Sequence, residues 1–331
     1  MTNISDVAAL AGVSTATVSR VLNGTARVNP LLAERVRSAA QRLDYRPNAL
    51  ARNLRKRRSR VLALIISDIE NPFFTAVARG VEDVAQSNGF SVFLCNADEN
   101  PEKEARYLEI AAQERVAGVV LSPHSSDTDV SELISAAIPV VTIDRFLSTA
   151  VDSVVADSQS GARDATLHLL DEGWSNPACV TGPVNAITAI ERASGYRAAL
   201  SERGRESVTR IVHRDFRVEG GSSAALELLD SANPPDSFFS ASANLTLGII
   251  SALTSAGVVI GRDVGLVSFD DAPWATLIDP PLTVVSQPAY EIGRRAAVLL
   301  MQRVVDHTGS PADAVTLETD LIVRRSSRRQ R

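Results

Sequence analysis

Cysteine and histidine are scarce in this chain, which holds two cysteines and four histidines among 331 residues. Cys95 and Cys179 lie in apolar stretches typical of buried strands, and two cysteines cannot build a disulfide framework. We therefore expect buried free thiols and a reducing compartment. The histidines are scattered without the spacing of metal ligands, so the sequence predicts neither a metal centre nor another cofactor.

Long apolar runs and nucleotide-binding loops are missing as well. No stretch reaches the ~20 apolar residues of a membrane span, and no apolar run follows a basic start at the N-terminus, as it does in a signal peptide. We expect a cytoplasmic protein without a membrane partner. Glycine-rich dinucleotide loops, P-loops and nucleophile elbows are also absent, which counts against an enzyme.

The charge of the chain is unevenly distributed. The formal net charge is −5, which alone argues against a nucleic-acid partner. Residues 1–60, however, carry 12 Lys and Arg residues against 3 Asp and Glu residues, a net +9, whereas the remainder carries 22 against 36, a net −14. A basic segment joined to an acidic body is typical of a nucleic-acid-binding arm, and each phosphate contact adds a salt-dependent increment to affinity.

Two short helices are predicted near the N-terminus. Ser5 can cap the first, and Gly12 can adopt the left-handed conformation that ends it. Ser14 can then cap a second helix that begins at Thr15. Apolar residues at helical spacing give both helices an inward face: Val7, Ala8, Leu10, Ala11, Val18, Val21 and Leu22. A short helix, a glycine-bearing turn and a second short helix are typical of a helix-turn-helix.

A third helix and a short connector follow. Asn29–Pro30 opens the third helix, with proline at the first helical position. Its predicted packing residues are Leu32, Val36, Ala39 and Leu43. Pro47 then breaks the chain, Asn48 can cap, and residues 49–54 can form barely two turns of helix, ahead of a basic linker at residues 55–60. So short a helix is marginal in water, so we expect DNA or a twin subunit to stabilise it.

These segments resemble a known family of regulators. VAALAGVSTATVSRVLNG, followed by YRPNALARNL, is similar to the DNA-binding headpiece and hinge helix of the LacI/GalR (lactose-repressor) family. The resemblance implies that the second helix enters the DNA major groove. A helical hairpin that serves only as a dimerisation cap is the alternative, and the positive charge of the segment counts against it.

The recognition helix supplies the predicted base contacts. Thr15 and Ala16 at its start are small enough to touch a thymine methyl group, and Arg20 can donate two hydrogen bonds to guanine. Phosphate contacts, which orient the protein without specifying sequence, are expected from Thr17, Ser19 and Asn23.

The connector supplies two further predicted DNA contacts, from Asn48 and Leu54. Resemblance to the family implies that Leu54 wedges between base steps of the minor groove and kinks the duplex. The alternative is that Leu54 packs against its twin hinge, although Leu50, one turn earlier, can make that contact.

After residue 60, short apolar runs alternate with helical periods. The first set of predicted strands reads VLALII, SVFLC, AGVVLS, PVVTI and DSVVA, and the second reads ACVTG, VTRIVH, DSFFS, VGLVSF and TVVS. Helices are predicted over Thr75–Asn88, Pro101–Arg115, Asp127–Ala137, 188–204, 219–230, 244–257 and 289–306. Buried strands alternating with helices indicate a parallel sheet covered on both faces, and two such sets indicate two lobes with a cleft between them.

Polar and aromatic residues follow the predicted strands, at the sheet edge where ligands bind in open α/β folds. They are Ser67–Asp68, Asn71, Phe73, Phe74, Asp144–Arg145, Phe216, Ser242 and Asp270–Asp271, and Arg192 lies just inside the helix after TGPVNA. Carboxylates can accept paired hydroxyls, arginine can donate a bidentate fork, and aromatic rings can cover the apolar face of a sugar or base. The pattern suits a small polar ligand. Capping or strand-end roles are the alternative for Asp68, Asp144, Asp270 and Asp271, and packing roles for Phe73, Phe74, Phe216 and Trp274. Arg192 could instead lie on the surface of its helix.

The resemblance extends over the body. Stretches such as LIISDIENPFF, ERASGYRAAL and VGLVSFDD are similar to the family's effector-binding core, whose fold resembles periplasmic sugar-binding proteins. It implies a headpiece at 1–60 with a hinge helix at about 48–55, and an effector-binding body at 61–331. The body would divide into an N-lobe of about 61–158 and 287–317 and a C-lobe of about 159–286 and 318–331, with crossings near 158–162, 285–289 and 317–320.

The resemblance also assigns effector-binding roles. Asp144, Arg192, Phe216 and Asp270 match positions that contact effector in relatives, and Phe73 and Phe74 follow the first strand, where ligand-stacking residues are common. One departure matters. Relatives usually carry Asn-Asp where this chain has Ser242–Ala243, so the sequence does not carry over a particular ligand.

The sequence therefore predicts an α/β regulator with an all-α headpiece and a two-lobed, doubly wound body. We expect a homodimer on a near-palindromic double-stranded operator, acting as a repressor under the control of a small effector, a sugar or sugar derivative. A purine corepressor or a partner protein is the alternative within the same fold. An enzyme and a transport-type binding protein are the more distant alternatives.

Overall fold

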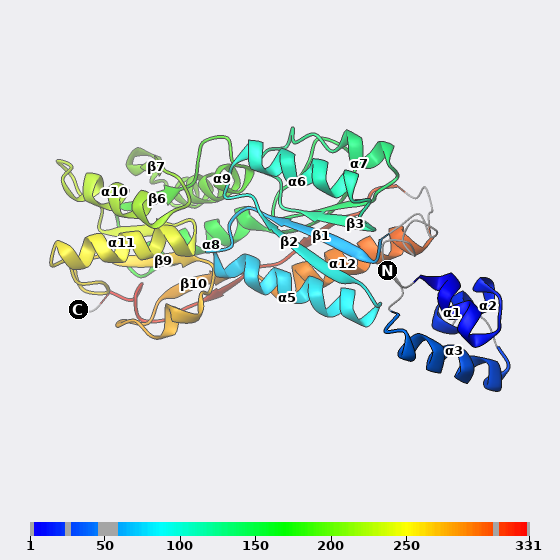
Figure 1. Cartoon of the computed structure of the whole chain (residues 1–331). Coiled ribbons are helices and arrows are strands. Elements are labelled where there is room, and N and C mark those ends of the chain that lie inside the picture. Colours follow the sequence, from blue (N-terminus) through cyan, green and yellow to red (C-terminus); the bar gives the residue numbers. More distant parts are fainter. Residues whose placement is uncertain (1–2, 24–27, 46–58, 307–310, 330–331) are drawn as a thin grey trace. The chain divides into compact units, whose positions relative to one another are not determined.

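The computed structural model describes residues 3–23, 28–45, 59–306 and 311–329. Residue contacts divide the chain between Ser59 and Arg60 into two units (Figure 1). The hinge helix expected at about 48–55, with Asn48 and Leu54, lies outside the described residues, as does the side chain of Asn23.

Three helices form the first unit: α1 (Ile4–Ala11), α2 (Thr15–Asn23) and α3 (Pro30–Arg42). They enclose a small core of Val7, Ala8, Ala11, Val18, Val36, Ala39 and Ala40. The helix-turn-helix prediction holds. The expected inward position of Leu10 is wrong, because 45% of that residue is exposed.

The N-terminal cap of α1 is Asn3, so the prediction for Ser5 is wrong. The Asn3 side-chain oxygen accepts hydrogen bonds from the backbone N–H groups of Ser5, at 2.8 Å, and Asp6, at 3.2 Å, while the Asp6 carboxylate accepts from the Asn3 N–H at 2.8 Å. This reciprocal capping box begins the helix one residue before Ser5. The other two predictions are confirmed: Gly12 has φ of +63°, and the Ser14 hydroxyl accepts from the Thr17 N–H at 3.2 Å.

The second unit contains two six-stranded sheets. The N-lobe sheet has the order β11 (Ala314–Leu317), β5 (Asp152–Ala156), β4 (Val140–Ile143), β3 (Gly118–Leu121), β1 (Val61–Ile66), β2 (Ser91–Asn96). The C-lobe sheet has the order β12 (Asp320–Ile322), β10 (Thr283–Ser286), β9 (Gly265–Phe269), β8 (Ser237–Ser240), β6 (Pro177–Thr181), β7 (Ile211–His213). All pairings are parallel except that of β12 with β10.

Helices cover both faces of each sheet (Figure 1). In the N-lobe, α5 (Pro72–Ser87) and α12 (Ala289–Asp306) enclose one core, and α6 (Pro101–Gln113) with α7 (Ser131–Ser135) encloses the other. In the C-lobe, α8 (Ser158–Asp171) and α9 (Ile187–Glu202) lie opposite α10 (Val218–Leu229) and α11 (Ala243–Ser255). The doubly wound fold predicted from alternating apolar strands and helices is therefore confirmed.

Three element boundaries differ from those predicted. Helix α5 begins at Pro72 rather than Thr75, because the Asn71 side chain accepts a hydrogen bond from the Phe73 N–H at 3.0 Å and caps the helix there. Helix α7 (Ser131–Ser135) is shorter than Asp127–Ala137. The Ser125 hydroxyl accepts from the Asp127 N–H in a turn before the helix, and the Asp129 carboxylate accepts from the Ser131 N–H where the helix begins. Strand β7 is shorter than VTRIVH because Glu206–Val208 forms a 3₁₀ turn.

The chain crosses between the two sheets three times. The crossings are at Asp157, after β5, at Gln287–Pro288, between β10 and α12, and at residues 318–319, between β11 and β12. Each crossing directly follows a strand, so the ends of β5, β10 and β11 lie where the two lobes join. In the described part of the chain, no helix is both long and apolar enough to cross a membrane.

Candidate effector-binding cleft and DNA-reading helix

The seven residues predicted to contact effector line one cavity between the lobes. They are Phe73, Phe74, Asp144, Arg192, Phe216, Ser242 and Asp270. Strand ends supply Asp144 (after β4) and Asp270 (after β9), while helices α5 and α9 supply the phenylalanine pair and Arg192. The cavity measures about 30 Å³, room for one or two waters, whereas ligand pockets usually exceed ~300 Å³. In this conformation the cavity is therefore smaller than a sugar.

On the N-lobe side, Arg145 is held by Glu99. Its Nη1 and Nη2 atoms donate to the two Glu99 carboxylate oxygens at 2.9 and 2.5 Å, and Nη1 also donates to the Pro123 carbonyl at 3.2 Å. The buried Nε of Arg145 lies 3.4 Å from the Asp144 carboxylate and has no hydrogen-bond partner. Burial raises the pKa of Glu99, but the charge of Arg145 and the donors of His124 and Arg145 outweigh burial and bring that pKa to about 2.

On the C-lobe side, Arg192 is fixed by the backbone and by an aromatic ring. Its Nη1 donates to the Ala241 carbonyl at 2.7 Å, and its guanidinium carbon lies 3.8 Å from the centroid of the Phe269 ring. Burial raises the pKa values of Asp144 and Asp270, and the charge of Arg192 partly offsets both shifts. Two buried carboxylates thus line the cavity together with two buried cations, Arg145 and Arg192.

Three aromatic rings complete the wall. Phe73 and Phe74 stand edge to face with centroids 5.0 Å apart, and both also belong to the N-lobe core. Phe216 is half-buried and lies against Gly182, where a Cβ atom would come within 2.2 Å of the ring. A glycine is therefore required at position 182 for Phe216 to face the cavity.

Ser242 has a structural task besides its place in the wall. Its hydroxyl oxygen accepts a hydrogen bond from the Leu245 N–H at 3.2 Å and caps α11. Asp271 lies outside the cavity, where Arg324 binds its carboxylate at 2.9 and 2.8 Å, and Trp274 packs beside the C-lobe core. Asp68 does line the cavity.

Sequence reasoning missed Glu99, Thr188 and Gln287 as cavity residues and named Arg145 only as a strand-end residue. Gln287 follows β10 directly, so the rule of polar residues at strand ends could have found it. Glu99 has no such signal, because it lies three residues beyond β2 in a turn with φ of +52°.

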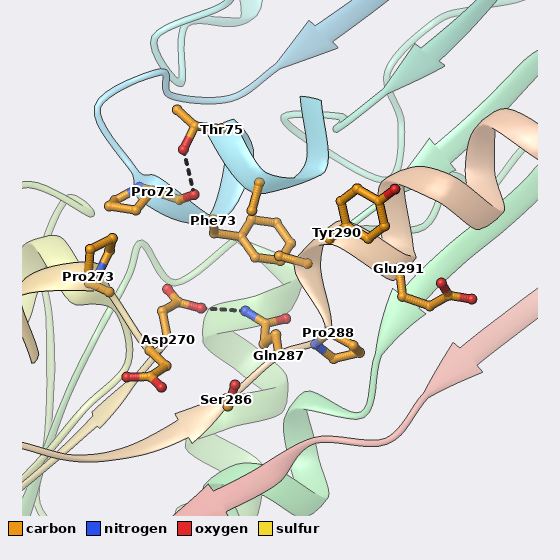
Figure 2. Close-up of a pocket in the computed structure, with 14 residues that line it drawn as sticks. Pro72, Phe73, Thr75, Asp270, Pro273, Ser286, Gln287, Pro288, Tyr290 and Glu291 are labelled. Carbon is orange, nitrogen blue, oxygen red and sulfur yellow. Dashed lines mark hydrogen bonds between the residues drawn. The ribbon is translucent and has the colours of Figure 1, made fainter. Parts of the chain in front are cut away.

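A larger groove of about 570 Å³ adjoins the cavity (Figure 2). It is bordered by the start of α5, the loop after β9 and residues 286–291, and it shares Phe73, Asp270 and Gln287 with the cavity. In Figure 2, Gln287 Nε2 donates to Asp270 Oδ1, at 2.6 Å, between the two spaces. Despite its size, the groove contains only two of the seven predicted residues, and we place the candidate site in the smaller cavity, where the charged groups converge.

The first unit presents helix α2 as its candidate DNA-reading surface. Thr15, Ala16 and Arg20 are exposed, whereas Val18 is buried beneath them. Ser19 and Thr17 are half-buried, and the Thr17 hydroxyl lies 2.9 Å from that of Ser14 at the helix start. The exposed face of α2 thus presents the three residues that sequence analysis assigned to base contacts.

A helix-turn-helix unit joined to a two-lobed ligand domain defines a class of regulators. Comparison with family models identifies both parts: "Bacterial regulatory proteins, lacI family" matches residues 3–48, and "Periplasmic binding proteins and sugar binding domain of LacI family" matches residues 59–324. The chain belongs to the LacI family. It is a DNA-binding transcriptional regulator with an effector domain, as the resemblance implied.

Individual relatives agree with this assignment. The chain is 36% identical over 330 residues to the ribose operon repressor of Halalkalibacterium halodurans, covering 99% of this chain and 98% of the relative. The solved transcriptional regulator CelR–cellobiose complex matches with 33% identity and a TM-score of 0.72, covering 98% of this chain and all of that one. The lac repressor dimer bound to operator and anti-inducer ONPF, at 23% identity and a TM-score of 0.85 over 98% and 99% of the two chains, shares the fold. The named relatives are regulators rather than enzymes.

Proposed function

We propose that the chain is a cytoplasmic, non-enzymatic repressor that binds a near-palindromic operator as a homodimer and responds to a small sugar held between its lobes. One observation carries the proposal. The seven residues expected to contact effector come from six separate segments of the body and line a single cavity.

The chemistry of the cavity favours a neutral, hydroxyl-rich effector. Four carboxylates line it, those of Asp68, Glu99, Asp144 and Asp270, against the two guanidinium groups of Arg145 and Arg192. The formal charge of this set is negative, which disfavours a phosphate or a nucleotide. Carboxylates accept pairs of sugar hydroxyls, and the phenylalanine rings suit the apolar face of a sugar ring. The names of the ribose and cellobiose regulators support a sugar as well.

The proposed DNA contacts come from the basic unit at residues 1–60. Thr15, Ala16 and Arg20 would read bases in the major groove, and Leu54 would kink the minor groove. Thr17, Ser19, Asn23 and Asn48 are the remaining proposed contacts. Thr17 is the weakest of these, because its hydroxyl already lies within hydrogen-bond distance of Ser14.

Effector control is proposed to act through the angle between the lobes. Sugar binding would change that angle and, through it, the spacing of the two connectors at residues 46–58. A coupling of ~1–3 kcal/mol changes operator occupancy substantially.

A thermal-shift screen of the whole chain tests the effector proposal. Sugars, sugar phosphates and nucleobases are compared, since a binder raises the unfolding temperature by mass action. The hit is then repeated with Asp270→Ala, which should abolish the shift, and with Asp230→Ala, an exposed control at the end of α10 that lines neither the cavity nor the groove. A shift produced only by nucleobases would favour the purine corepressor instead.

A further inference from the structure

One side-chain hydrogen bond reaches directly from lobe to lobe across the cleft. Asn244 Nδ2, in the first turn of α11 in the C-lobe, donates to Asp68 Oδ2, which follows β1 in the N-lobe, at 3.3 Å. Among the described residues, no other hydrogen bond joins side chains of the two lobes away from the three crossings. This contact therefore links the lobes at a point that the backbone does not.

Local hydrogen bonds hold the segments of both partners, Asn244 in a helix and Asp68 in the loop after β1. The Ser242 cap fixes the first turn of α11, and Asn244 is only 7% exposed. Asp68 Oδ1 accepts from the Glu70 N–H at 2.9 Å, which leaves Oδ2 for Asn244. Little conformational entropy remains to be lost when the two side chains meet, so the net gain is larger than for a pair of exposed side chains.

Attraction between opposite charges on the two lobes also favours the closed cleft. Arg217, at the start of α10 in the C-lobe, attracts the carboxylates of Asp68 and Asp98 in the N-lobe. Asn244 itself does not line the effector cavity. Its hydrogen bond is thus made to the opposite lobe rather than to the cavity.

We propose that Asn244 and Asp68 form an interlobe latch that stabilises the closed cleft between the lobes. The inference rests on the proposed function, in that the latched cleft is the effector site. An effector enters the 30 Å³ cavity only after the hydrogen bond between Asn244 and Asp68 breaks. Once the effector is inside, the same hydrogen bond contributes to the stability of the closed form. Asn244 is a positioning residue in this account, because it acts through closure rather than through contact with the ligand.

The test is an exchange of the two side chains. Asn244→Asp sets a carboxylate against Asp68, while the start of α11 tolerates an acidic residue in its first turn. Adding Asp68→Asn restores the hydrogen bond with donor and acceptor reversed, and the new amide oxygen can still accept from the Glu70 N–H. Asn233→Asp is the matched control, since Asn233 is exposed on the same lobe and its main-chain oxygen, not its side chain, binds Arg210.

Hydrogen–deuterium exchange of the whole, effector-free chain reads out the closure. In Asn244→Asp, peptides covering residues 66–74 and 142–147 should exchange roughly tenfold faster, the population change expected from one lost charge-assisted hydrogen bond. The double variant should return to native rates, and Asn233→Asp should not depart from them. A peptide covering β6 serves as the internal reference for global stability.

The proposal is contradicted if the cleft peptides of Asn244→Asp exchange at the same rates as those of the native chain. It is also wrong if the double variant fails to restore them, and this second criterion decides the matter even if the single variant loosens the whole fold. Neither result bears on operator recognition, so failure of the latch is distinguishable from failure of the proposed function.

Discussion

The guanidinium carbon of Arg192 lies over the Phe269 ring, 3.8 Å from its centroid, while its Nη1 donates to the Ala241 carbonyl at 2.7 Å. The aromatic ring, the Ala241 carbonyl and the Ser158 hydroxyl, which accepts from Nε at 3.4 Å, together fix this guanidinium in the cavity wall. A buried cation held in this way can approach Asp144 and Asp270 without collapsing onto either carboxylate.

Replacement of this arginine should therefore weaken effector binding even when the charge is kept. Arg192→Lys removes the planar fork and the stacked face, and we expect a loss of roughly tenfold or more in effector affinity. Arg197→Lys, on the exposed face of the same helix, is the control and should bind normally. Isothermal titration with the screened sugar measures both, and equal affinities for the two variants would contradict the role given to Arg192.

The close contact between Gly182 and Phe216 predicts a second loss of affinity. Gly182→Ala brings a methyl group to within 2.2 Å of the Phe216 ring, so the ring must leave its place in the cavity wall. Overpacking of this kind costs ~1–3 kcal/mol of stability and should lower effector affinity while sparing operator binding. Thermal melts provide the check: the same change in a Phe216→Ala background should cost little, and an equal cost in both backgrounds would rule out the clash.

The ion pair of Glu99 and Arg145 predicts a pH dependence of stability. Because the folded pKa of Glu99 is about 2, below its ordinary 4.5, the pair stabilises the fold fully above the ordinary value and loses its effect as the pH falls toward 2. Glu99→Gln should lower the free energy of unfolding at pH 7 by ~1–3 kcal/mol. The difference from the native chain should shrink between pH 4.5 and 2.

Urea unfolding over that pH range measures this difference. Glu102→Gln, exposed at the start of α6, is the control and should match the native chain at every pH. A Glu99→Gln deficit that stays constant down to pH 2 would show that the ion pair is not its source.

The segment after β12 should stabilise the C-lobe. Trp174 Nε1 donates to the Ser327 carbonyl at 2.6 Å, the Ser326 hydroxyl accepts from the Thr283 N–H at 2.8 Å, and both serines are fully buried. Removal of residues 326–331 should expose these partners and cost at least ~2–4 kcal/mol of stability. Arg328→Ala, in an exposed position, should cost much less, and equal melting temperatures for the truncated and native chains would contradict this assignment.

The fold could be predicted from sequence because the hydrophobic periodicity, the helix-capping residues and the turn residues all indicated the same elements. Short apolar strands alternate with amphipathic helices, so the doubly wound sheets and the polar strand ends followed from periodicity. The wrongly predicted helix starts arise because a neighbouring side chain caps the helix in place of the expected one. Asn3 and Asp6 form a reciprocal box that outcompetes a cap at Ser5, and the side chain of Asn71 begins α5 early enough to place Phe73 in a helix.

The candidate site could be predicted only in part, for a physical reason. Asp144 and Asp270 end strands, where the topology itself brings polar groups together. Glu99 and Asn244 reach the cleft through a turn of unusual backbone conformation and through closure of the lobes. Neither route leaves a periodic signal in the sequence, because both depend on segments that meet only in the folded chain.

Sequence-specific DNA binding is the most direct test of the account as a whole. The full-length chain is incubated with random duplex DNA, and the retained sequences are compared with those retained by Arg20→Ala. We predict that the native chain selects a near-palindrome of two half-sites, that Arg20→Ala loses this preference, and that a sugar found in the screen changes the affinity for the selected operator. If the native chain retained random DNA without any sequence preference, at every salt concentration and with every ligand tested, the assignment as a sequence-specific regulator would be contradicted.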